Sequence, residues 1–198
     1  MSQTIENLIS GYLKDFNLSS NELKIIISKL KPITVKKGDY FLNEGKICNQ
    51  IGILYDGLLH AYYKDFNSEV QVSRFFFFPI NVLVTSFDSF THRAPSNESI
   101  QALEDSFLLT ISHDDLDILY KNISSMNYIG RYFAELSYLQ AMERVHNLQA
   151  LNASQRIEKL YSEFPKLFNR ISKKHLSSYL GINRNSITNF LKSKILMK

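Results

Sequence analysis

The sequence predicts an α+β protein that combines an N-terminal antiparallel β-roll, one long helix and a C-terminal domain made only of helices. Over residues 33–112, short alternating apolar runs are separated by turns with glycine and aspartate, which is typical of an antiparallel sandwich or barrel. A helical apolar period follows over residues 126–151, and two short helical patterns around a glycine lie near the end. We therefore divide the chain into residues 1–125, residues 126–151 and residues 152–198.

The composition is that of a folded protein in a reducing compartment. The 198 residues are 44% hydrophobic and 21% charged, with a formal net charge of +4, so the chain can form a core and is not disordered. The single cysteine, Cys48, excludes an internal disulfide framework and an iron–sulfur cluster, which ordinarily takes four thiolates. Residues 1–6 lack signal-peptide features, and no apolar run reaches the ~20 residues of a membrane helix. We expect a cytoplasmic protein with no membrane contact and no metal site.

Two helical segments precede the strands, over residues 4–30 with a break at 17–20. The turns between the strands lie at residues 37–39, 44–46, 56–57 and 65–68. Strands over residues 99–103 and 106–111 close the β region. Four consecutive phenylalanines, Phe75 to Phe78, suggest a ligand box, but core packing of a strand is the commoner arrangement and is the one we predict.

A long helix is predicted over residues 126–151, after a shorter one that begins at Ser112. About 25 helical residues span ~37 Å, which is longer than the flank of a small domain requires. We therefore expect this helix to pair with its copy in a coiled-coil-like dimer. The predicted dimer interface consists of Met126, Ile129, Phe133, Leu136, Gln140 and Val145. The alternative is that this apolar stripe lies wholly on the chain's own β domain.

Residues 171–192 form the pattern of a helix-turn-helix, after a helix that Pro165 ends. Ser172 can cap the first helix, and Gly181 takes the left-handed conformation that ends it. Asn183 can cap the second helix. The apolar face of that second helix consists of Ile187, Phe190 and Leu191, and its opposite face is polar.

This polar face suits the major groove of DNA, because arginine bonds guanine, asparagine bonds adenine and threonine contacts the thymine methyl group. Residues 150–198 contain ten basic and two acidic residues, while the remainder of the chain is net negative. Segregated positive charge is typical of a phosphate-binding surface. The predicted DNA-binding residues are Ser172, Lys173, Lys174, Asn183, Arg184, Asn185, Ser186, Thr188, Asn189 and Lys192. The alternative is a plain helical hairpin with a solvated polar face.

The order of these parts, with two motifs in the β region, resembles the CRP/FNR family of bacterial transcription regulators. The motifs are Val35–Gly45 (VKKGDYFLNEG) and Ile53–Tyr63 (ILYDGLLHAYY), and the resemblance covers nearly the whole chain. It implies a jelly roll of the cyclic-nucleotide-binding type and a homodimer that binds a palindromic operator in double-stranded DNA. Half-sites would lie one DNA turn apart, ~34 Å. RNA polymerase and a small-molecule effector are further partners that the resemblance implies.

The second half of the helix-turn-helix departs from the family pattern. Better-known members often have glutamate where Asn185 stands and arginine where Asn189 stands, and two asparagines favour contacts to adenine instead. The operator sequence of those members therefore cannot be transferred. The usual β-hairpin wing after this helix should be reduced or absent, because the sequence ends soon after Lys192.

The sensor region departs further. In cyclic-nucleotide-binding members, a Gly-Glu turn holds the ribose and an Arg-Ser pair neutralises the phosphate. Here the glutamate is absent and Pro95 stands where the arginine is expected, so a buried phosphate would lack its cation. We expect no cyclic AMP binding of the usual kind, and the effector stays unknown. The predicted ligand pocket consists of Arg74, Thr85, Ser86, Phe87, Arg93 and Ser96.

No pattern of catalysis emerges from the sequence. It has no phosphate-cradling loop, no HExxH and no paired CxxC, and a helix start accounts for the acids at Asp114, Asp115 and Asp117. We expect a DNA-binding regulator and not an enzyme. The alternative is a metabolite- or nucleotide-binding module whose helical tail makes protein contacts.

Overall fold

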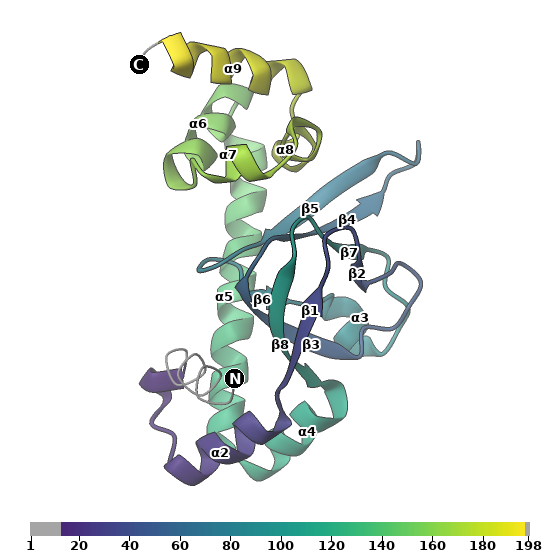
Figure 1. Cartoon of the computed structure of the whole chain (residues 1–198), viewed down its shortest axis with the longest axis vertical. Coiled ribbons are helices and arrows are strands. Elements are labelled where there is room, and N and C mark those ends of the chain that lie inside the picture. The colour runs from purple at the N-terminus through teal and green to yellow at the C-terminus, as the bar shows by residue number, and fades with distance from the viewer. Residues whose placement is uncertain (1–12, 197–198) are drawn as a thin grey trace.

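The computed structural model describes residues 13–196, in which a β-roll lies beside a long helix and a small helical domain sits at one end of that helix (Figure 1). The strands are β1 (Lys31–Val35), β2 (Tyr40–Leu42), β3 (Gln50–Asp56), β4 (Leu59–Lys64), β5 (Val70–Phe76), β6 (Leu83–Val84), β7 (Ser99–Ala102) and β8 (Ser106–Ser112). The helices are η1 (Lys14–Phe16), α2 (Ser20–Lys29), α3 (Phe87–His92), α4 (His113–Asn122), α5 (Ser124–Ala150), α6 (Ala153–Glu163), α7 (Leu167–Arg170), α8 (Lys173–Leu180) and α9 (Arg184–Leu196). Of the first helical segment expected, residues 4–16, residues 4–12 lie outside the described residues, and Lys14–Phe16 form the short η1.

The roll consists of two four-stranded sheets, ordered β1-β8-β3-β6 and β2-β7-β4-β5, and its strand pairs are antiparallel. Side chains alternate along each strand, so one face of each sheet points into the roll. Leu54 and Leu108 from one sheet and Leu59 and Ile100 from the other are completely buried in a single core. The predicted antiparallel β-roll is therefore confirmed.

Helices α2 and α4 and the first half of α5 extend this core outside the roll. Ile26 of α2, Leu119 of α4 and Ile129 of α5 belong to the same cluster of buried residues. Ser112 caps α4 as predicted, since its hydroxyl accepts a hydrogen bond from the Asp115 N–H at 3.1 Å. The first half of α5 is thus anchored on the chain's own β domain.

Phe75 and Phe76 of β5 and the following Phe77 point alternately to two different cores. Phe76 lies in the core of the roll, while Phe75 and Phe77 belong to a second core with residues of the C-terminal helices. That second core contains Ile157, Leu167, Phe168, Ile171, Leu176, Leu180 and Ile187. The prediction of core packing is confirmed for Phe75 to Phe77, whereas Phe78 is 53% exposed.

The C-terminal domain is built only of helices, α6 to α9 (Figure 1). No strand follows β8 in the described residues, which run to 196. None of the helices in this described part of the chain combines the length and apolar character needed to cross a bilayer.

Gly57 is predicted to be the glycine that tolerates a side chain least. Its φ is +106°, and an added Cβ would lie 2.5 Å from the Cα of Ser106 and 2.7 Å from the carbonyl oxygen of Asp105. Gly38 provides a matched control, because its φ is +90° but no atom lies within 4 Å of an added Cβ. Gly57→Ala should lower the free energy of unfolding by about 2–4 kcal/mol, and Gly38→Ala by about 1 kcal/mol. Urea denaturation measures both, and equal losses would contradict the backbone clash at Gly57.

Candidate nucleic-acid interface

The helix-turn-helix is held together by the three local interactions that its sequence predicts. The Ser172 hydroxyl accepts from the His175 N–H at 3.2 Å and caps α8. Gly181 ends α8 at φ +62°, in the left-handed region. The Asn183 side chain accepts from the Asn185 N–H at 2.8 Å at the start of α9. These interactions fix where α8 begins and ends and where α9 begins.

The apolar face of α9 points inward, as predicted. Ile187 is completely buried, together with Leu176 of α8. Phe190 packs edge-on against Tyr161 of α6, with ring centroids 5.3 Å apart, and also contacts Phe168. This packing leaves the opposite face of α9 toward solvent.

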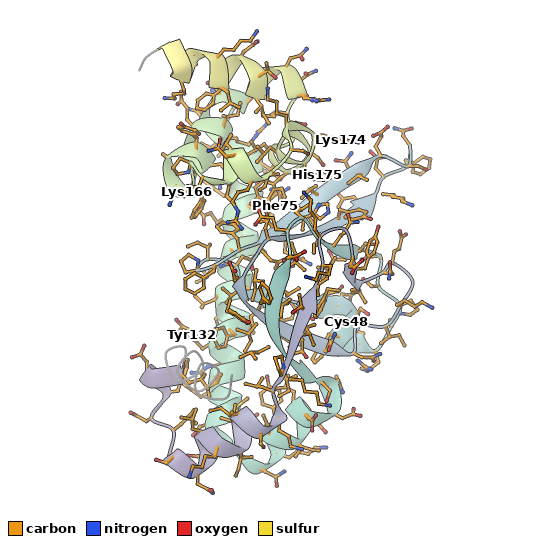
Figure 2. All side chains as sticks on the ribbon, in the orientation of Figure 1. Cys48, Phe75, Tyr132, Lys166, Lys174 and His175 are labelled. Atoms are coloured by element: carbon orange, nitrogen blue, oxygen red, sulfur yellow. The ribbon has the colours of Figure 1, made fainter. Side chains whose placement is uncertain are left out.

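Seven of the ten predicted DNA-binding side chains are exposed. Arg184, Asn185, Asn189 and Lys192 are exposed on α9, and Ser172, Lys174 and Asn183 are exposed around it, while Lys173, Ser186 and Thr188 are half-buried. Figure 2 labels Lys174 on α8. Neither α8 nor α9 carries an acidic residue. Two of the predicted residues have a local role as well, because Ser172 and Asn183 use their side-chain oxygens as caps.

Three basic residues of the C-terminal region are committed to contacts within the chain, which sequence reasoning missed. Arg170 binds Glu104 at 2.6 Å and the Gly57 carbonyl oxygen at 3.0 Å, which ties α7 to the roll. Arg156 donates to the carbonyl oxygens of Leu151 and Gly181. Lys159 binds Glu143 of α5 at 2.6 Å, and this hydrogen bond raises the pKa of the Lys159 amine. The charge count over residues 150–198 therefore overstates the cations available to a phosphate backbone.

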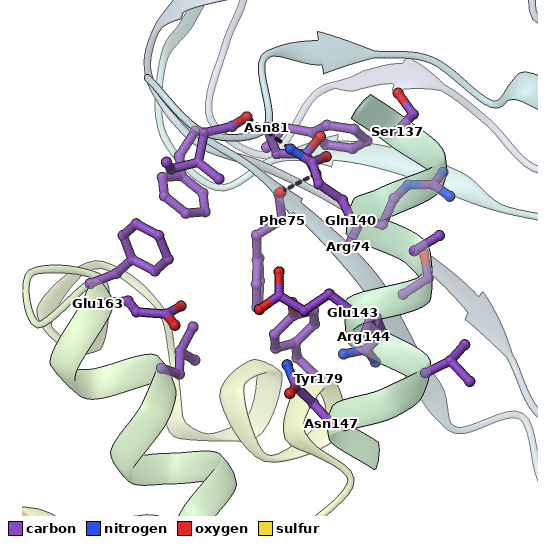
Figure 3. A pocket seen from close by; sticks show the side chains of 18 of the residues that line it. Arg74, Phe75, Asn81, Ser137, Gln140, Glu143, Arg144, Asn147, Glu163 and Tyr179 are labelled. Atoms are coloured by element: carbon purple, nitrogen blue, oxygen red, sulfur yellow. Dashed lines mark hydrogen bonds between the residues drawn. The ribbon is translucent and has the colours of Figure 1, made fainter. Parts of the chain in front are cut away.

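A cavity of about 910 Å³ lies between β5, α5, α6 and α8 (Figure 3). Of the predicted ligand-pocket residues, Arg74, Thr85 and Phe87 line it. Ser86 and Ser96 are buried away from the cavity, with their hydroxyls 3.3 Å apart. Arg93 is a correction to the predicted pocket, because its guanidinium donates to the Cys48 carbonyl oxygen at 2.8 Å and to Asn49, outside the cavity lining.

The polar group at the roll end of the cavity is an ion pair that the sequence did not predict. Arg74 of β5 binds the carboxylate of Glu98, which is only 8% exposed, and its guanidinium also donates to the Thr85 carbonyl oxygen at 3.4 Å. The Ser73 hydroxyl donates to the other Glu98 oxygen at 3.3 Å. The cation that could replace the missing phosphate-binding arginine therefore already has a carboxylate partner.

The predicted dimer interface needs correction, because α5 turns part of the predicted stripe inward. Met126 and Ile129 are buried in the chain's own core, Phe133 packs against that core, and Gln140 donates to the Ile80 carbonyl oxygen at 3.2 Å. These four positions agree with the alternative, in which the apolar stripe of α5 packs on the chain's own β domain. Leu136 and Val145 are exposed.

A second set of apolar side chains on α5 faces solvent. Its members are Tyr128, Tyr132, Tyr138, Leu139, Met142 and Val145. Together with Leu136, and without Tyr138, these residues recur every three to four positions and follow the helical period, so most of them form one stripe along the helix. Leu139, at 61% exposed, lies near its centre.

No family model matches this sequence, and no curated protein matches it. Several solved structures are similar to this chain. FixK2 from Bradyrhizobium japonicum superposes with a TM-score of 0.70 at 12% identity, covering 85% of each chain. The c-di-GMP responsive global regulator CLP from Xanthomonas campestris gives a TM-score of 0.67 at 14% identity, over 90% of this chain and 92% of that one.

A protein from Eubacterium rectale ATCC 33656, classed with the transcriptional regulators of the CRP/FNR family, gives a TM-score of 0.68 at 18% identity. The match covers 93% of this chain and 87% of that one, so it includes the roll, the long helix and the helix-turn-helix together. The chain has the fold of the CRP/FNR transcription regulators.

Proposed function

We propose that this protein is a dimeric, sequence-specific DNA-binding transcription regulator and not an enzyme. The observation that carries the proposal is the outward face of α9, where Arg184, Asn185, Asn189 and Lys192 are exposed on a helix without acidic residues. A helix of this kind fits the major groove, and the preceding α8 crosses the phosphate backbone in such motifs. Lys173 and Lys174 of α8 supply cations for that backbone.

The identity of the exposed side chains supports a preference for particular bases. Asn185 and Asn189 lie one helical turn apart and favour adenine, whereas Arg184 favours guanine. The Thr188 hydroxyl donates to the Arg184 carbonyl oxygen at 3.4 Å, so its methyl group is the part left for a thymine contact. We propose a half-site that contains adenines next to a guanine.

The dimer is proposed on the solvent-facing apolar stripe of α5. Exposed large apolar side chains at helical spacing favour a partner surface, and a parallel pair of such helices forms a coiled-coil-like seam. A two-fold axis along this seam would present two copies of α9 to a palindromic operator. A regulator bound in this way at a promoter would have RNA polymerase as a further partner.

The effector, if the roll binds one, is proposed to differ from cyclic AMP. A cyclic phosphate entering beside Arg74 would meet the buried carboxylate of Glu98, which already neutralises the guanidinium. Like charges in a partly dry site repel strongly, and displacing Glu98 would leave it without a counter-ion. The roll is therefore better suited to another small molecule.

A second candidate function is a metabolite-binding module whose helical tail contacts proteins. Salt dependence separates the two functions. Binding of duplex DNA by the regulator should weaken steeply with rising salt, because phosphate contacts release counterions. A tail that only contacts proteins would show no such binding.

Arg184→Ala is predicted to weaken binding to the preferred duplex by about 1–3 kcal/mol and to relax specificity at one base pair. Lys192→Ala should weaken binding to all sequences about equally and lower the salt slope by about one. Lys24→Ala, at an exposed position of α2, serves as the control and should change neither quantity. Fluorescence anisotropy with a selected duplex and its single-base variants measures these effects. An equal loss on every sequence for Arg184→Ala would contradict a base contact.

Leu139→Asp combined with Met142→Asp is predicted to convert a dimer into a folded monomer, because each chain would bring two carboxylates into the α5 seam. Phe66→Asp provides a matched control, since Phe66 is a fully exposed apolar residue on the β4–β5 turn. This control should remain a dimer. Sedimentation velocity distinguishes the species, and a monomeric wild-type protein would contradict the proposed dimer.

Titration calorimetry with cyclic AMP is predicted to show no binding in the micromolar range, because the buried carboxylate of Glu98 would repel the cyclic phosphate. Micromolar binding to the wild-type protein would contradict this reading of the roll.

A further inference from the structure

The C-terminal domain rests on the roll through α8, which lies against the edge strand β5. The Ser178 hydroxyl donates to the Val70 carbonyl oxygen at 2.9 Å and accepts from the Val72 N–H at 2.8 Å. The rings of Tyr179 and Phe75 are 5.0 Å apart. Backbone groups that an edge strand would otherwise present to water are thus satisfied by α8.

A pair of histidines lies within this contact. His60 of β4 and His175 of α8 have ring centroids 4.7 Å apart, with an angle of 37° between the ring planes. His60 is only 1% exposed and its ring is stacked on Phe75 at 6.5 Å, and His175 is half-buried. Figure 2 labels His175 and Phe75 where the helical domain meets the roll. Two imidazoles therefore meet across the interface between the two parts of the chain.

The surroundings of this pair stabilise neutral imidazoles. Neither Nδ1 atom has a hydrogen-bond partner within the described residues. The Nε2 of His60 lies 3.4 Å from the Gln101 amide oxygen of β7, which is uncharged. Nor does any set of three possible metal ligands occur in the part of the chain that the structure describes, so these rings are not part of such a cluster.

The charged and titratable groups around the pair offer no counter-ion for a second proton. On α8, Lys174 is the neighbour of His175 and is itself a cation. On β4, the Tyr62 ring is 5.0 Å from His60, and the Tyr62 hydroxyl pairs with Tyr40 of β2. The carboxylate of Glu104 is bound by Arg170 at another point of the interface. A protonated imidazole would thus sit in a poorly solvated contact beside a second cation.

We propose that the His60–His175 contact is a proton-controlled latch, which holds the helix-turn-helix domain on the roll when both imidazoles are neutral and releases it when they are protonated. Release would solvate both rings and separate their charges. The connection that would act as the hinge is short and extended, since α5 ends at Ala150 and both its C-cap, Leu151, and the N-cap of α6, Asn152, have β-region backbone angles.

The direction of the pH dependence follows from the docked state. Burial, with a contribution from the nearby His175, lowers the pKa of His60 to about 4, and burial together with Lys174 lowers the pKa of His175. A group whose pKa is lowered on docking favours the docked state above its ordinary value of 6.5 and loses that contribution as the pH falls toward 4. Residues of the roll such as Phe75 and Gln101 also bury His60, so the decrease of the docking constant is at most the full lowering of its pKa, roughly a hundredfold.

The consequence for DNA rests on the proposed function. The position of α9 relative to the roll, and hence to its copy in a dimer, would change when the latch opens. Only the docked or the released arrangement can match the half-site spacing of a given operator, so proton binding would alter operator affinity.

Nuclear magnetic resonance of the full-length chain tests the latch without DNA. The imidazole signals of the histidines and the amide signal of Val72 are followed from about pH 7.5 to about pH 3.5. His60 and His175 should titrate below the ordinary histidine pKa of 6.5. The Val72 amide should shift with the same midpoint, because it loses its Ser178 partner on release. An unchanged Val72 signal while His60 titrates would overturn the proposal.

Variants identify the titrating group. His60→Phe combined with His175→Phe keeps two stacked rings without protons to bind, and should leave Val72 in its docked position across the whole range. His146→Gln, on the exposed face of α5, is the matched control, and its Val72 signal should respond to pH as in the wild type. A wild-type pH response in the double variant would overturn the latch.

If the double variant is already released at neutral pH, His175→Gln alone replaces it, and its Val72 response should be markedly smaller than that of the wild type. An undiminished response would again overturn the proposal. DNA affinity is measured separately on the same samples. A chain that shows the latch but binds no duplex would contradict the proposed function alone.

Discussion

Strand β5 belongs to two hydrophobic cores at once, and the arrangement of the whole molecule depends on this. Phe76 points into the roll, while Phe75 and Phe77 point into the core of the helical domain. Because side chains alternate along a strand, one short apolar segment can join two layers that would otherwise be separate domains. A helix-turn-helix connected only through the end of α5 could take many orientations, and β5 selects one of them.

Polar groups complete this junction. Ser178 satisfies the backbone of the edge strand, and the guanidinium of Arg144 lies 4.0 Å over the Tyr179 ring while it donates to the Val72 carbonyl oxygen. The Arg170–Glu104 ion pair holds the other side of the contact. Apolar contacts are non-directional, so these hydrogen bonds and the ion pair are what fix the orientation of the two parts. As a consequence, the interface also contains titratable side chains with little access to water.

Helix α5 has different partners on its two faces. Its inner face completes the core of the roll through Met126 and Ile129, and its outer face leaves Leu139 and Met142 to solvent. The cavity beside β5 lies between this helix and the helical domain. Helix α5 therefore adjoins the roll and the helical domain, and it also carries the proposed dimer seam. A helix in this position transmits a change at one site to the others only if it has two alternative packings.

Sequence reasoning was sufficient where the cause and the effect lie close together in the chain. The turn glycine Gly181 and the strand alternation act over a few residues, so the roll, the long helix and the helix-turn-helix were predictable. The pairing of Arg74 with Glu98 and of His60 with His175 was not, because each joins residues from different elements. Nor could a period of 3.6 residues tell which face of α5 is inward, since both faces carry apolar side chains and only packing against the roll distinguishes them.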